Sequence, residues 1–532
     1  MPLKSSPGWS KAIRIIMVIL TVEFSIVGIM KEDNASILGL IRFFSCFTVC
    51  SIFILLYSYF KDKVTNCLIV GLALWTLYET VTGLLQNSGM IDSNHSLFSI
   101  TGSFRNPNPY AGFLAVSLGI LLSFVQGKAG VAKGIKRLAV LAIALIVVIL
   151  PSTKCRSAYV AVMVIIGLLI WKQDGCRKFL TSWATLIIPL IMISVLVLYL
   201  WKKPSADWRM FQARISCRAM KDNLLFGSGL GHYGMAATKT QFSFFQDRLV
   251  LNDGEIQMPA YINSDCKRAA WLETAFCDPL QIGVEAGLVS MVTYLILVSL
   301  TLLQLYNKGS VLFYGALALH IISLFSYPLM LWQNELLLAA MTGEAGAYES
   351  GKDVRWRPMI AVLLISVTAI ICFYPTYRRV ISDKKEWQSD RYFYNIGEYG
   401  LYSDYCSDKL NSQNCNSEFL LEYGVALGKT GKIGLSDSIL SIGFGTTGNP
   451  AFLISLGDNR ACESDYDRAE EYYWNAFCCI PDRLLPLKRI ADIYSKQGKT
   501  YSLSRLQLFV RNYHPKIESD LTKRLRAEIE EL

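Results

Sequence analysis

Hydrophobic and polar residues divide the chain into long apolar runs, one long polar interval and a polar tail. Apolar runs near the roughly 20 residues that cross a bilayer recur as far as residue 376. They predict eleven spans, at about 11–30, 36–60, 64–86, 110–126, 138–151, 158–172, 179–201, 279–305, 311–327, 330–346 and 358–376. The polar interval, residues 202–278, is too long for an ordinary connecting loop, so we expect it to be the active region.

From about residue 380 the chain has no run of spanning length and alternates polar and apolar residues at helical spacing. We therefore predict two all-α domains. Residues 1–376 form a polytopic helical membrane domain that includes the polar interval, and residues 377–532 form a soluble helical domain.

Basic residues in the short connections indicate the orientation, because Lys and Arg near span ends stay in the cytoplasm. With the N-terminus inside, the inner connections hold Lys4, Lys11, Arg14, Lys61, Lys63, Lys128, Lys133, Lys136, Arg137, Lys172, Arg177, Lys178, Lys308, Lys352, Arg355 and Arg357. The outer short loops hold only Lys31, Arg105, Lys154 and Arg156. An odd number of spans then places the polar interval and the C-terminal domain together outside the cytoplasm.

Composition supports this class and excludes others. The chain has 532 residues, of which 52% are hydrophobic, and a mean hydropathy of +0.34, which fits a soluble α/β enzyme poorly. The net charge of +10 does not indicate a nucleic-acid partner, because residues 381–532 contain 19 basic and 22 acidic residues, a net charge of −3. The basic excess lies in the membrane half.

The fourteen cysteines form no CxxC pair and no zinc-ligand spacing, so we expect no metal site. Cys406 and Cys415 are close in sequence and form a disulfide or remain free thiols, depending on whether the compartment oxidises them. Cys217 with Cys266 is a weaker pair with the same alternatives.

Three outward-facing stretches carry candidate chemistry. Residues 100–116 contain Arg105 and Asn106 before a span, residues 152–162 contain Arg156 at a span start, and the polar interval contains Arg209, Arg214, Arg218 and Lys221 at helical spacing. Each also has a structural interpretation: a rigid helix-start turn, an interfacial arginine and a membrane-surface amphipathic helix. The run GSGLGH that follows has no preceding strand, so it predicts a tight turn rather than a phosphate loop.

Five segments in this order carry a family resemblance: GSFRNPNPYAGFLAV, KCRSAYVAV, SADWRMFQARISCRAMKDNLLFGSGLGHY, TKTQFSFF and AFCDPLQIGVEAGLVS. Together they resemble the O-antigen ligase and polymerase superfamily over about residues 100–330. The resemblance implies a bacterial inner-membrane protein that transfers a glycan from an undecaprenyl-diphosphate carrier to a lipid, glycan or protein acceptor on the periplasmic face. It implies no cofactor and no metal.

The resemblance assigns residues one at a time. The family's Ser-Arg motif corresponds to Arg156, and its Gly-Arg motif corresponds to Trp208-Arg209. Both guanidinium groups suit a diphosphate leaving group, which they can bind bidentately. The further expected substrate-binding residues are Arg105, Asn106, Arg214, Arg218 and Glu285, with Arg214 and Arg218 assigned to lipid headgroups.

The chain departs from the family where many members carry a His-Asn pair, taken to activate the acceptor. Phe276 and Cys277 occupy those positions, and Ser290 replaces the second glycine of the following Gly-x-x-Gly motif. The remaining candidate bases are Asp278, Glu285, Glu273 and His232, of which we favour Asp278. The alternatives are a repeat-unit polymerase, a transporter or flippase, and a catalytically silent scaffold.

The tail resembles degenerate tetratricopeptide repeats, because Pro450, Pro481 and Pro515 lie 31 and 34 residues apart between paired helical segments. Such a tail binds a protein partner or only caps the polar interval. Within the spans, Arg42 and Glu79 lie at similar depth and are expected to pair. His320 is expected to be a hydrogen-bonded bundle histidine.

Overall fold

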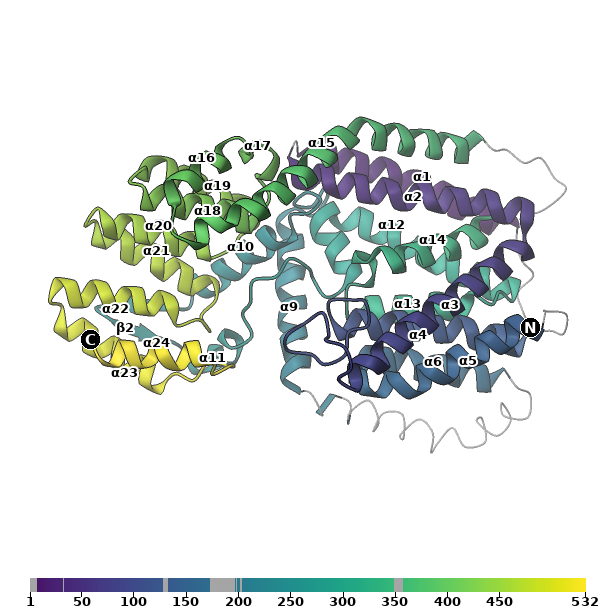
Figure 1. Ribbon diagram of the computed structural model, residues 1–532, viewed down its shortest axis with the longest axis horizontal. Helices are drawn as coiled ribbons and strands as arrows, with labels where there is room; N and C mark the ends of the chain where they lie inside the picture. The colour runs from purple at the N-terminus through teal and green to yellow at the C-terminus, as the bar shows by residue number, and fades with distance from the viewer. Residues whose placement is uncertain are drawn as a thin grey trace.

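The computed structural model describes residues 7–31, 33–127, 133–172, 197, 199–200, 203–348 and 357–532. Within these ranges the chain forms helices and one short antiparallel hairpin (Figure 1). The apolar helices lie at one end of the molecule, and the polar interval and the C-terminal helices lie at the other. The all-helical class predicted from the pattern is confirmed.

Seven of the described helices are long and apolar enough to cross a membrane, as expected of a multi-pass membrane protein. They are α1 (Pro7–Ile29), α2 (Asn34–Phe60), α3 (Asp62–Asn87), α4 (Pro107–Gln126), α5 (Lys133–Ile149, continued by the 3-10 turn η1, Leu150–Thr153), α12 (Asp278–Lys308) and α15 (Arg357–Asn395). Three other predicted spans coincide with shorter helices: α6 (Arg156–Trp171), α13 (Phe313–Ser323) and α14 (Trp332–Gly346). The predicted span 179–201 lies almost wholly outside the described residues.

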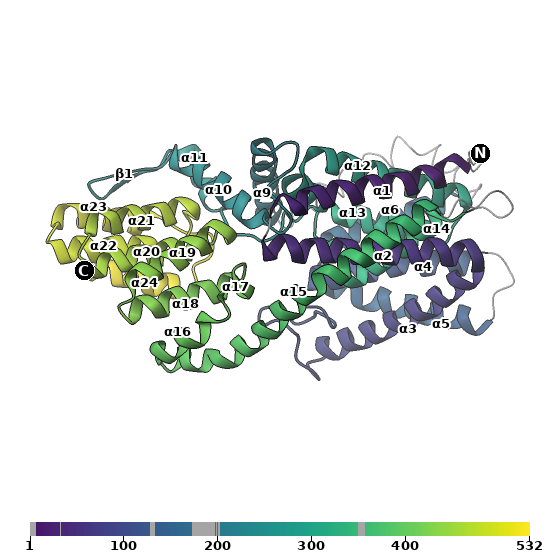
Figure 2. The same cartoon turned by 90° about the horizontal axis from the view of Figure 1, so that it is seen from above.

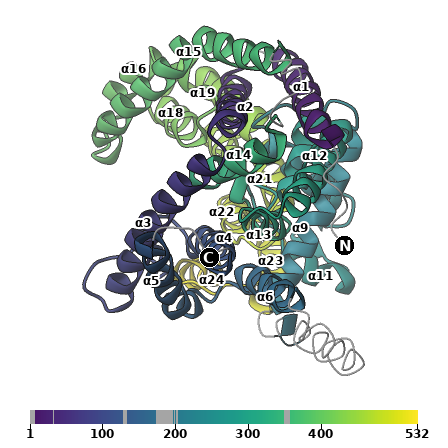
Figure 3. The same cartoon turned by 90° about the vertical axis from the view of Figure 1, so that its right-hand side faces the viewer.

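Helix α4 is the most buried of the seven candidate spans. In its most apolar window 78% of the residues are buried, against 28% in α12, and it packs against α3, α5, α6 and α13 (Figure 3). The peripheral helices leave most of their apolar side chains on the outside. In water such a surface would be far larger than soluble monomers expose, whereas a lipid surround matches it.

The polar interval is an ordered unit rather than a loop. It contains α9 (Lys203–Asp222), α10 (Tyr233–Gln246), the hairpin strands β1 (Val250–Asn252) and β2 (Glu255–Gln257), and α11 (Ala260–Cys266). The hairpin turn at Asp253-Gly254 has positive φ at both residues, as a tight two-residue turn requires. The apolar face of α9 is buried through Phe211, Ile215 and Ala219.

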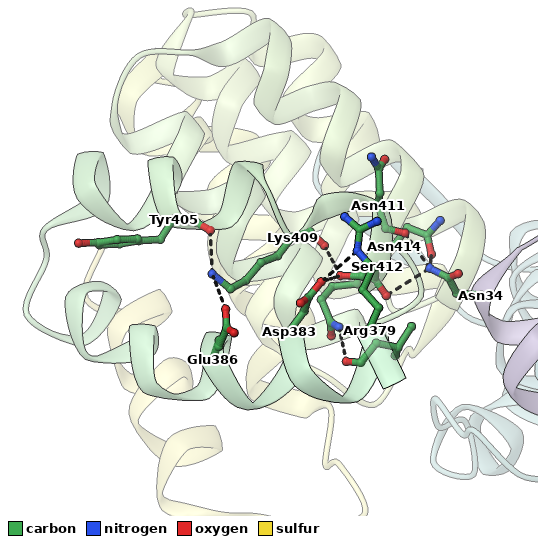
Figure 4. Close-up of polar contacts among 11 residues, drawn as sticks. Asn34, Arg379, Asp383, Glu386, Tyr405, Lys409, Asn411, Ser412 and Asn414 are labelled. Atoms are coloured by element: carbon green, nitrogen blue, oxygen red, sulfur yellow. Dashed lines mark hydrogen bonds and ion pairs between the residues drawn. The ribbon is translucent and has the colours of Figure 1, made fainter. Parts of the chain in front are cut away.

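Helix α15 connects the apolar group to the tail without a break. It runs through Pro375 and across the predicted boundary at residues 376 and 377, so the transition lies inside a helix (Figure 2). After it come α16 (Tyr399–Ser407) and α17 (Leu410–Gln413). The side chain of Asn34, at the start of α2, donates to the carbonyls of Asn411 and Ser412 in α17, at 2.7 and 3.2 Å (Figure 4).

The remaining tail helices come in antiparallel pairs: α18 (Ser417–Lys429) with α19 (Ile433–Thr447), α20 (Ala451–Cys462) with α21 (Tyr466–Cys479), and α22 (Leu485–Gln497) with α23 (Thr500–Asn512), followed by α24 (Asp520–Glu530). The three pairs begin at residues 417, 451 and 485, which are 34 residues apart. Close packing within a pair depends on a small residue. A Cβ atom on Gly424 would lie 2.5 Å from Leu440, and one on Gly457 would lie 2.5 Å from Tyr473.

The polar interval and the tail share one hydrophobic core. It joins Phe211 of α9 and Phe245 of α10 to buried residues of every tail pair. Hydrogen bonds cross the same interface: Gln241 donates to the carbonyl of Cys479 at 2.6 Å, and the Trp271 ring N–H donates to the carbonyl of Thr447 at 3.0 Å. This packing holds both polar regions on the same side of the apolar helices.

The expected pair of Arg42 with Glu79 is wrong. Arg42 Nε lies 2.7 Å from Glu335 Oε1 of α14. The fully buried Glu79 carboxylate accepts from the backbone N–H of Ser103 at 2.9 Å and from its hydroxyl, so it anchors the loop before α4. Similar positions along their predicted spans did not place these side chains on facing sides of their helices.

The cysteines proposed as disulfide pairs are free thiols in the structure. Cys406 and Cys266 are buried, Cys415 is half-buried and Cys217 is exposed on α9. His320 lies near Tyr294, whose hydroxyl is 3.5 Å from its Nδ1, while its Nε2 has no hydrogen-bond partner among the described residues. Within the described part of the chain, His320 is therefore hydrogen-bonded, as expected, at Nδ1 but not at Nε2.

Candidate functional site

Arg156 and Arg209 converge from distant parts of the sequence. Arg156 is the first residue of α6, directly after the turn η1, and Arg209 projects from α9 of the polar interval. Burial lowers the pKa of the Arg209 guanidinium, and the nearby positive charge of Arg156 lowers that pKa further. Cys155 and Tyr327 act in the opposite direction and raise it. The two guanidinium groups are therefore close enough to influence each other.

Arg209 has spare binding capacity. Its Nε atom is buried without a hydrogen-bond partner, and it makes no ion pair within the described residues. An arginine stays protonated even when partly buried, so its desolvated charge next to a second cation is unfavourable without a counter-ion. A bound anion with several oxygens would supply both the charge and the missing acceptors.

Local structure fixes the position of Arg156. Pro151 lies in η1, and Lys154 adopts a left-handed conformation with φ of 51°, which turns the chain sharply into α6. The Cys155 Sγ atom lies 4.0 Å from the carbonyl of Asn108, so α4 and α6 begin side by side. The guanidinium group therefore starts from a rigid helix end rather than from a loop.

The two candidate residues of the 100–116 stretch, Arg105 and Asn106, have modest roles in the structure. Arg105 is exposed. The Asn106 side chain accepts from the backbone N–H of Asn108 at 2.9 Å and so caps α4. Their expected contact with substrate stays a prediction.

Asp278 borders a cavity that neither Arg156 nor Arg209 lines. It is the first residue of α12, only 3% exposed, and its Oδ2 accepts from the backbone N–H of Leu329 at 3.2 Å. It lines a cavity of about 550 Å³ between α1, α2, α12 and α14, together with Arg42, Glu285 and Glu335. Asp278 forms no ion pair with Arg209 among the described residues. The cavity that the predicted base lines therefore does not include the predicted diphosphate site.

The glycine-rich run docks onto a break in α12. Gly287 interrupts the helix with φ of 88°, which leaves carbonyls of the preceding turn without helical partners. The backbone N–H groups of Ser228 and Gly229 donate to the carbonyls of Val284 and Glu285 at 2.8 and 3.0 Å. The run is therefore a tight turn, as predicted, and its amides bind protein rather than phosphate.

The side chain of Glu285 belongs to the same junction. It accepts from Gln281 Nε2 at 2.5 Å and from the backbone N–H groups of Gly231 and Tyr233. A carboxylate with three donors anchors a loop well, and it has little capacity left for a substrate. Its expected substrate-binding role stays a prediction.

His232 is occupied as well. Its Nε2 lies 2.8 Å from Asp33 Oδ2, and its Nδ1 lies 3.0 Å from the carbonyl of Leu230. A carbonyl only accepts, so both ring nitrogens carry protons when Asp33 is ionised. Burial by itself lowers the pKa of His232, but the hydrogen bond and charge of Asp33 outweigh it and raise that pKa. A cationic histidine cannot act as the general base.

Glu273, the last of the four candidate bases, is exposed and lies on the wall of the cavity. Arg214 and Arg218 bind protein groups. Arg214 is 3.2 Å from Asp265, and Arg218 lies over the ring of Phe244 at 4.8 Å. Their assignment to lipid headgroups stays a prediction.

An aromatic cluster that the sequence interpretation missed borders the arginine pair. The ring of Phe276 lies 5.1 Å from that of Trp208 and 5.1 Å from that of Tyr327. Trp208 directly precedes Arg209, and Tyr327 acts on the charge of Arg209. The only sequence signal was the Trp-Arg dipeptide, because nothing in the pattern relates Tyr327 to α9.

No protein-family model matches the chain, and a search of the curated proteins gives no match either.

Proposed function

We propose that this chain is an inner-membrane glycosyltransferase of the O-antigen ligase type. It moves a glycan from an undecaprenyl-diphosphate carrier to a lipid, glycan or protein acceptor. The observation that carries the proposal is the convergence of Arg156 and Arg209, with the Arg209 Nε atom buried and unpartnered. The polar interval and the tail then face the periplasm, and the paired tail helices form a tetratricopeptide-like domain.

The arginines would stabilise the leaving group. In transfer, the acceptor oxygen bonds to the anomeric carbon, the bond from that carbon to the phosphate oxygen breaks, and its electron pair stays on the diphosphate. Fixed cationic donors in a poorly hydrated site stabilise that developing charge strongly. The proton of the acceptor passes to a base, for which Asp278 stays the proposed residue. In that case the acceptor hydroxyl approaches from the cavity side.

A second candidate is a non-transferring protein that binds the same lipid diphosphate. It is favoured by Phe276 at the family histidine position and by the engagement of His232 with Asp33. Both candidates require the arginine pair to bind a diphosphate, and only the first requires turnover. Loss of the base costs about a hundredfold to ten-thousandfold in rate, so slow transfer remains compatible with the structure.

A binding experiment tests the shared requirement. Titration of the purified full chain in lipid nanodiscs with farnesyl diphosphate should show saturable binding. Arg156→Lys and Arg209→Lys should each weaken it about tenfold, because lysine keeps the charge and loses the two-pronged contact. Arg218→Lys is the matched control, since Arg218 stacks on Phe244, and it should bind within twofold of the wild type. Unchanged binding in the Arg156→Lys, Arg209→Lys double variant would refute the diphosphate site.

A further inference from the structure

Three aromatic rings next to the arginine pair come from three separate segments. Trp208 lies on α9, Phe276 lies just before α12, and Tyr327 lies between α13 and the 3-10 turn η2 (Pro328–Met330). Phe276 is in the middle, with interplanar angles of 78° to Trp208 and 85° to Tyr327. All three side chains are half-buried, so each keeps part of its surface accessible. We call these three residues the aromatic shelf.

The shelf is not part of a hydrophobic core. The structure has one core among the apolar helices and a second one shared by the polar interval and the tail. None of the three rings belongs to either core, even as a partly buried neighbour. Large aromatic residues normally gain their stabilising effect by burial in such cores, so this cluster calls for another explanation.

The backbone at Phe276 is strained. Its φ of 52° lies in the left-handed region, which bulky side chains rarely adopt and where glycine would fit without cost. On either side the chain is tied down: the Ala275 N–H donates to Gln281 Oε1 at 2.7 Å, and Asp278 accepts from Leu329. These ties turn the Phe276 ring toward Trp208 and Tyr327. Strain of this kind is kept where the surroundings enforce it, and it concentrates at binding sites.

The chemistry around the rings is polar and cationic. Arg209 follows Trp208 in α9, and Lys516 of the tail lies over the Trp208 ring, with Nζ 5.8 Å from its centroid. A pyranose ring has the matching character, since its C–H faces are apolar and its hydroxyl edges accept hydrogen bonds. A sugar attached to a diphosphate at the arginines would lie beside these rings.

We propose that the aromatic shelf binds the first saccharide residue of the diphosphate-linked donor, and that Phe276 is its central contact. This inference rests on the proposed function, because it uses the diphosphate position to place the sugar. In this proposal Phe276, which replaces the family histidine, has a function of its own. The position contributes donor binding, and the acceptor proton must leave elsewhere.

The test compares two ligands on the purified full chain in nanodiscs: farnesyl diphosphate, and the same lipid diphosphate carrying one N-acetylglucosamine residue. In the wild type the sugar should tighten binding about tenfold. Phe276→Gly should abolish that gain and leave farnesyl diphosphate binding within twofold. Glycine also relieves the positive φ, so the variant should fold, which thermal melting checks. Phe276→Tyr keeps the ring and should keep the gain.

Each outcome separates the two proposals. If farnesyl diphosphate binds and the sugar adds nothing in the wild type, or if the gain survives in Phe276→Gly, the shelf is refuted while the diphosphate site stands. If neither ligand binds, the proposed function and the shelf both fall. Trp271→Phe is the matched aromatic control, because Trp271 packs against the core shared by the polar interval and the tail and donates to the Thr447 carbonyl. It should retain the full gain.

Discussion

Replacing Asn34 by alanine should loosen the contact between the start of α2 and the tail. The Asn34 side chain is 8% exposed, and its amide donates to the carbonyls of Asn411 and Ser412 and to the Asn414 side-chain oxygen, the last at 2.9 Å (Figure 4). Alanine removes these donors, and among their acceptors the Ser412 carbonyl belongs to a buried residue, whereas Asn411 is exposed and Asn414 is half-buried. The net value of a hydrogen bond is about 1 kcal/mol, and an unsatisfied buried group costs about 1–3 kcal/mol.

Two lost backbone contacts therefore predict a cost of about 2–3 kcal/mol in docking free energy. Each 1.4 kcal/mol is a factor of about ten, so local opening of α17 should become about 30- to 150-fold more frequent. The tail should stay attached, because other contacts hold α17. Gln413 donates to the carbonyl of Val380 on α15 at 2.7 Å, and Ser412 donates to Asp383.

Amide hydrogen exchange, followed by mass spectrometry on the full chain in nanodiscs, measures this opening. Exchange should rise over residues 409–416 and stay unchanged in α22. Asn449→Ala is the control, since Asn449 bonds Ser417 at 3.0 Å within the tail and should not alter exchange at α17. A change below twofold over residues 409–416 would refute the assigned role of Asn34, and so would a uniform rise along the whole chain.

Two further predictions concern the junction of the glycine-rich turn. Gly287→Ala should lower the melting temperature strongly and detach the turn, because the added Cβ would lie 2.1 Å from the Leu225 carbonyl oxygen. Gly71→Ala is the control, since Gly71 has open space around it, and this variant should melt near the wild type. Equal melting temperatures of the two variants would contradict the prediction. The stability lost in His232→Gln should be largest near pH 5–6 and shrink toward pH 9. The pKa of His232 is raised in the folded chain, so its pairing with Asp33 stabilises the fold fully below the unfolded-state pKa of about 6.5. This stabilisation is lost as the pH rises through the folded-state pKa of His232. The pKa of Asp33 is lowered, so protonation of Asp33 breaks the pair only in acid. A pH-independent difference would contradict the charged pair.

The ten predicted spans that fall on described residues coincide with helices, because the apolar character of such a run is visible in the local sequence. A lipid-facing helix must be apolar along its whole length, and that requirement is visible locally. The pairing of Arg42 was mispredicted for the opposite reason. Depth in the bilayer follows from sequence position, but rotation about the helix axis and the choice of neighbour depend on packing. Glu335, the actual partner, lies 293 residues away.

In the candidate site, too, the sequence identifies single residues, and only the structure shows which residues lie together. The motifs identified Arg156 and Arg209 individually, and the structure brings them together. The shelf was not predictable, since Tyr327 reaches Phe276 only through the folding of two loops. The break at Gly287 was equally hidden, because a glycine in an apolar run does not reveal its φ. Asp278 was placed at the end of the polar interval, one residue before a predicted span, and only the structure shows that it begins α12 and lines the cavity.

Surface glycan analysis measures whether this chain transfers a glycan in the cell. A strain that lacks the gene is complemented with the wild type, with the Arg156→Lys, Arg209→Lys double variant, or with Arg218→Lys as the control, at equal membrane levels. We expect deletion to remove or shorten one surface glycan. The wild type and Arg218→Lys should restore it, and the double variant should restore less than about one hundredth of it. Full restoration by the double variant, or an identical glycan profile with and without the gene, would contradict glycosyl transfer by this chain.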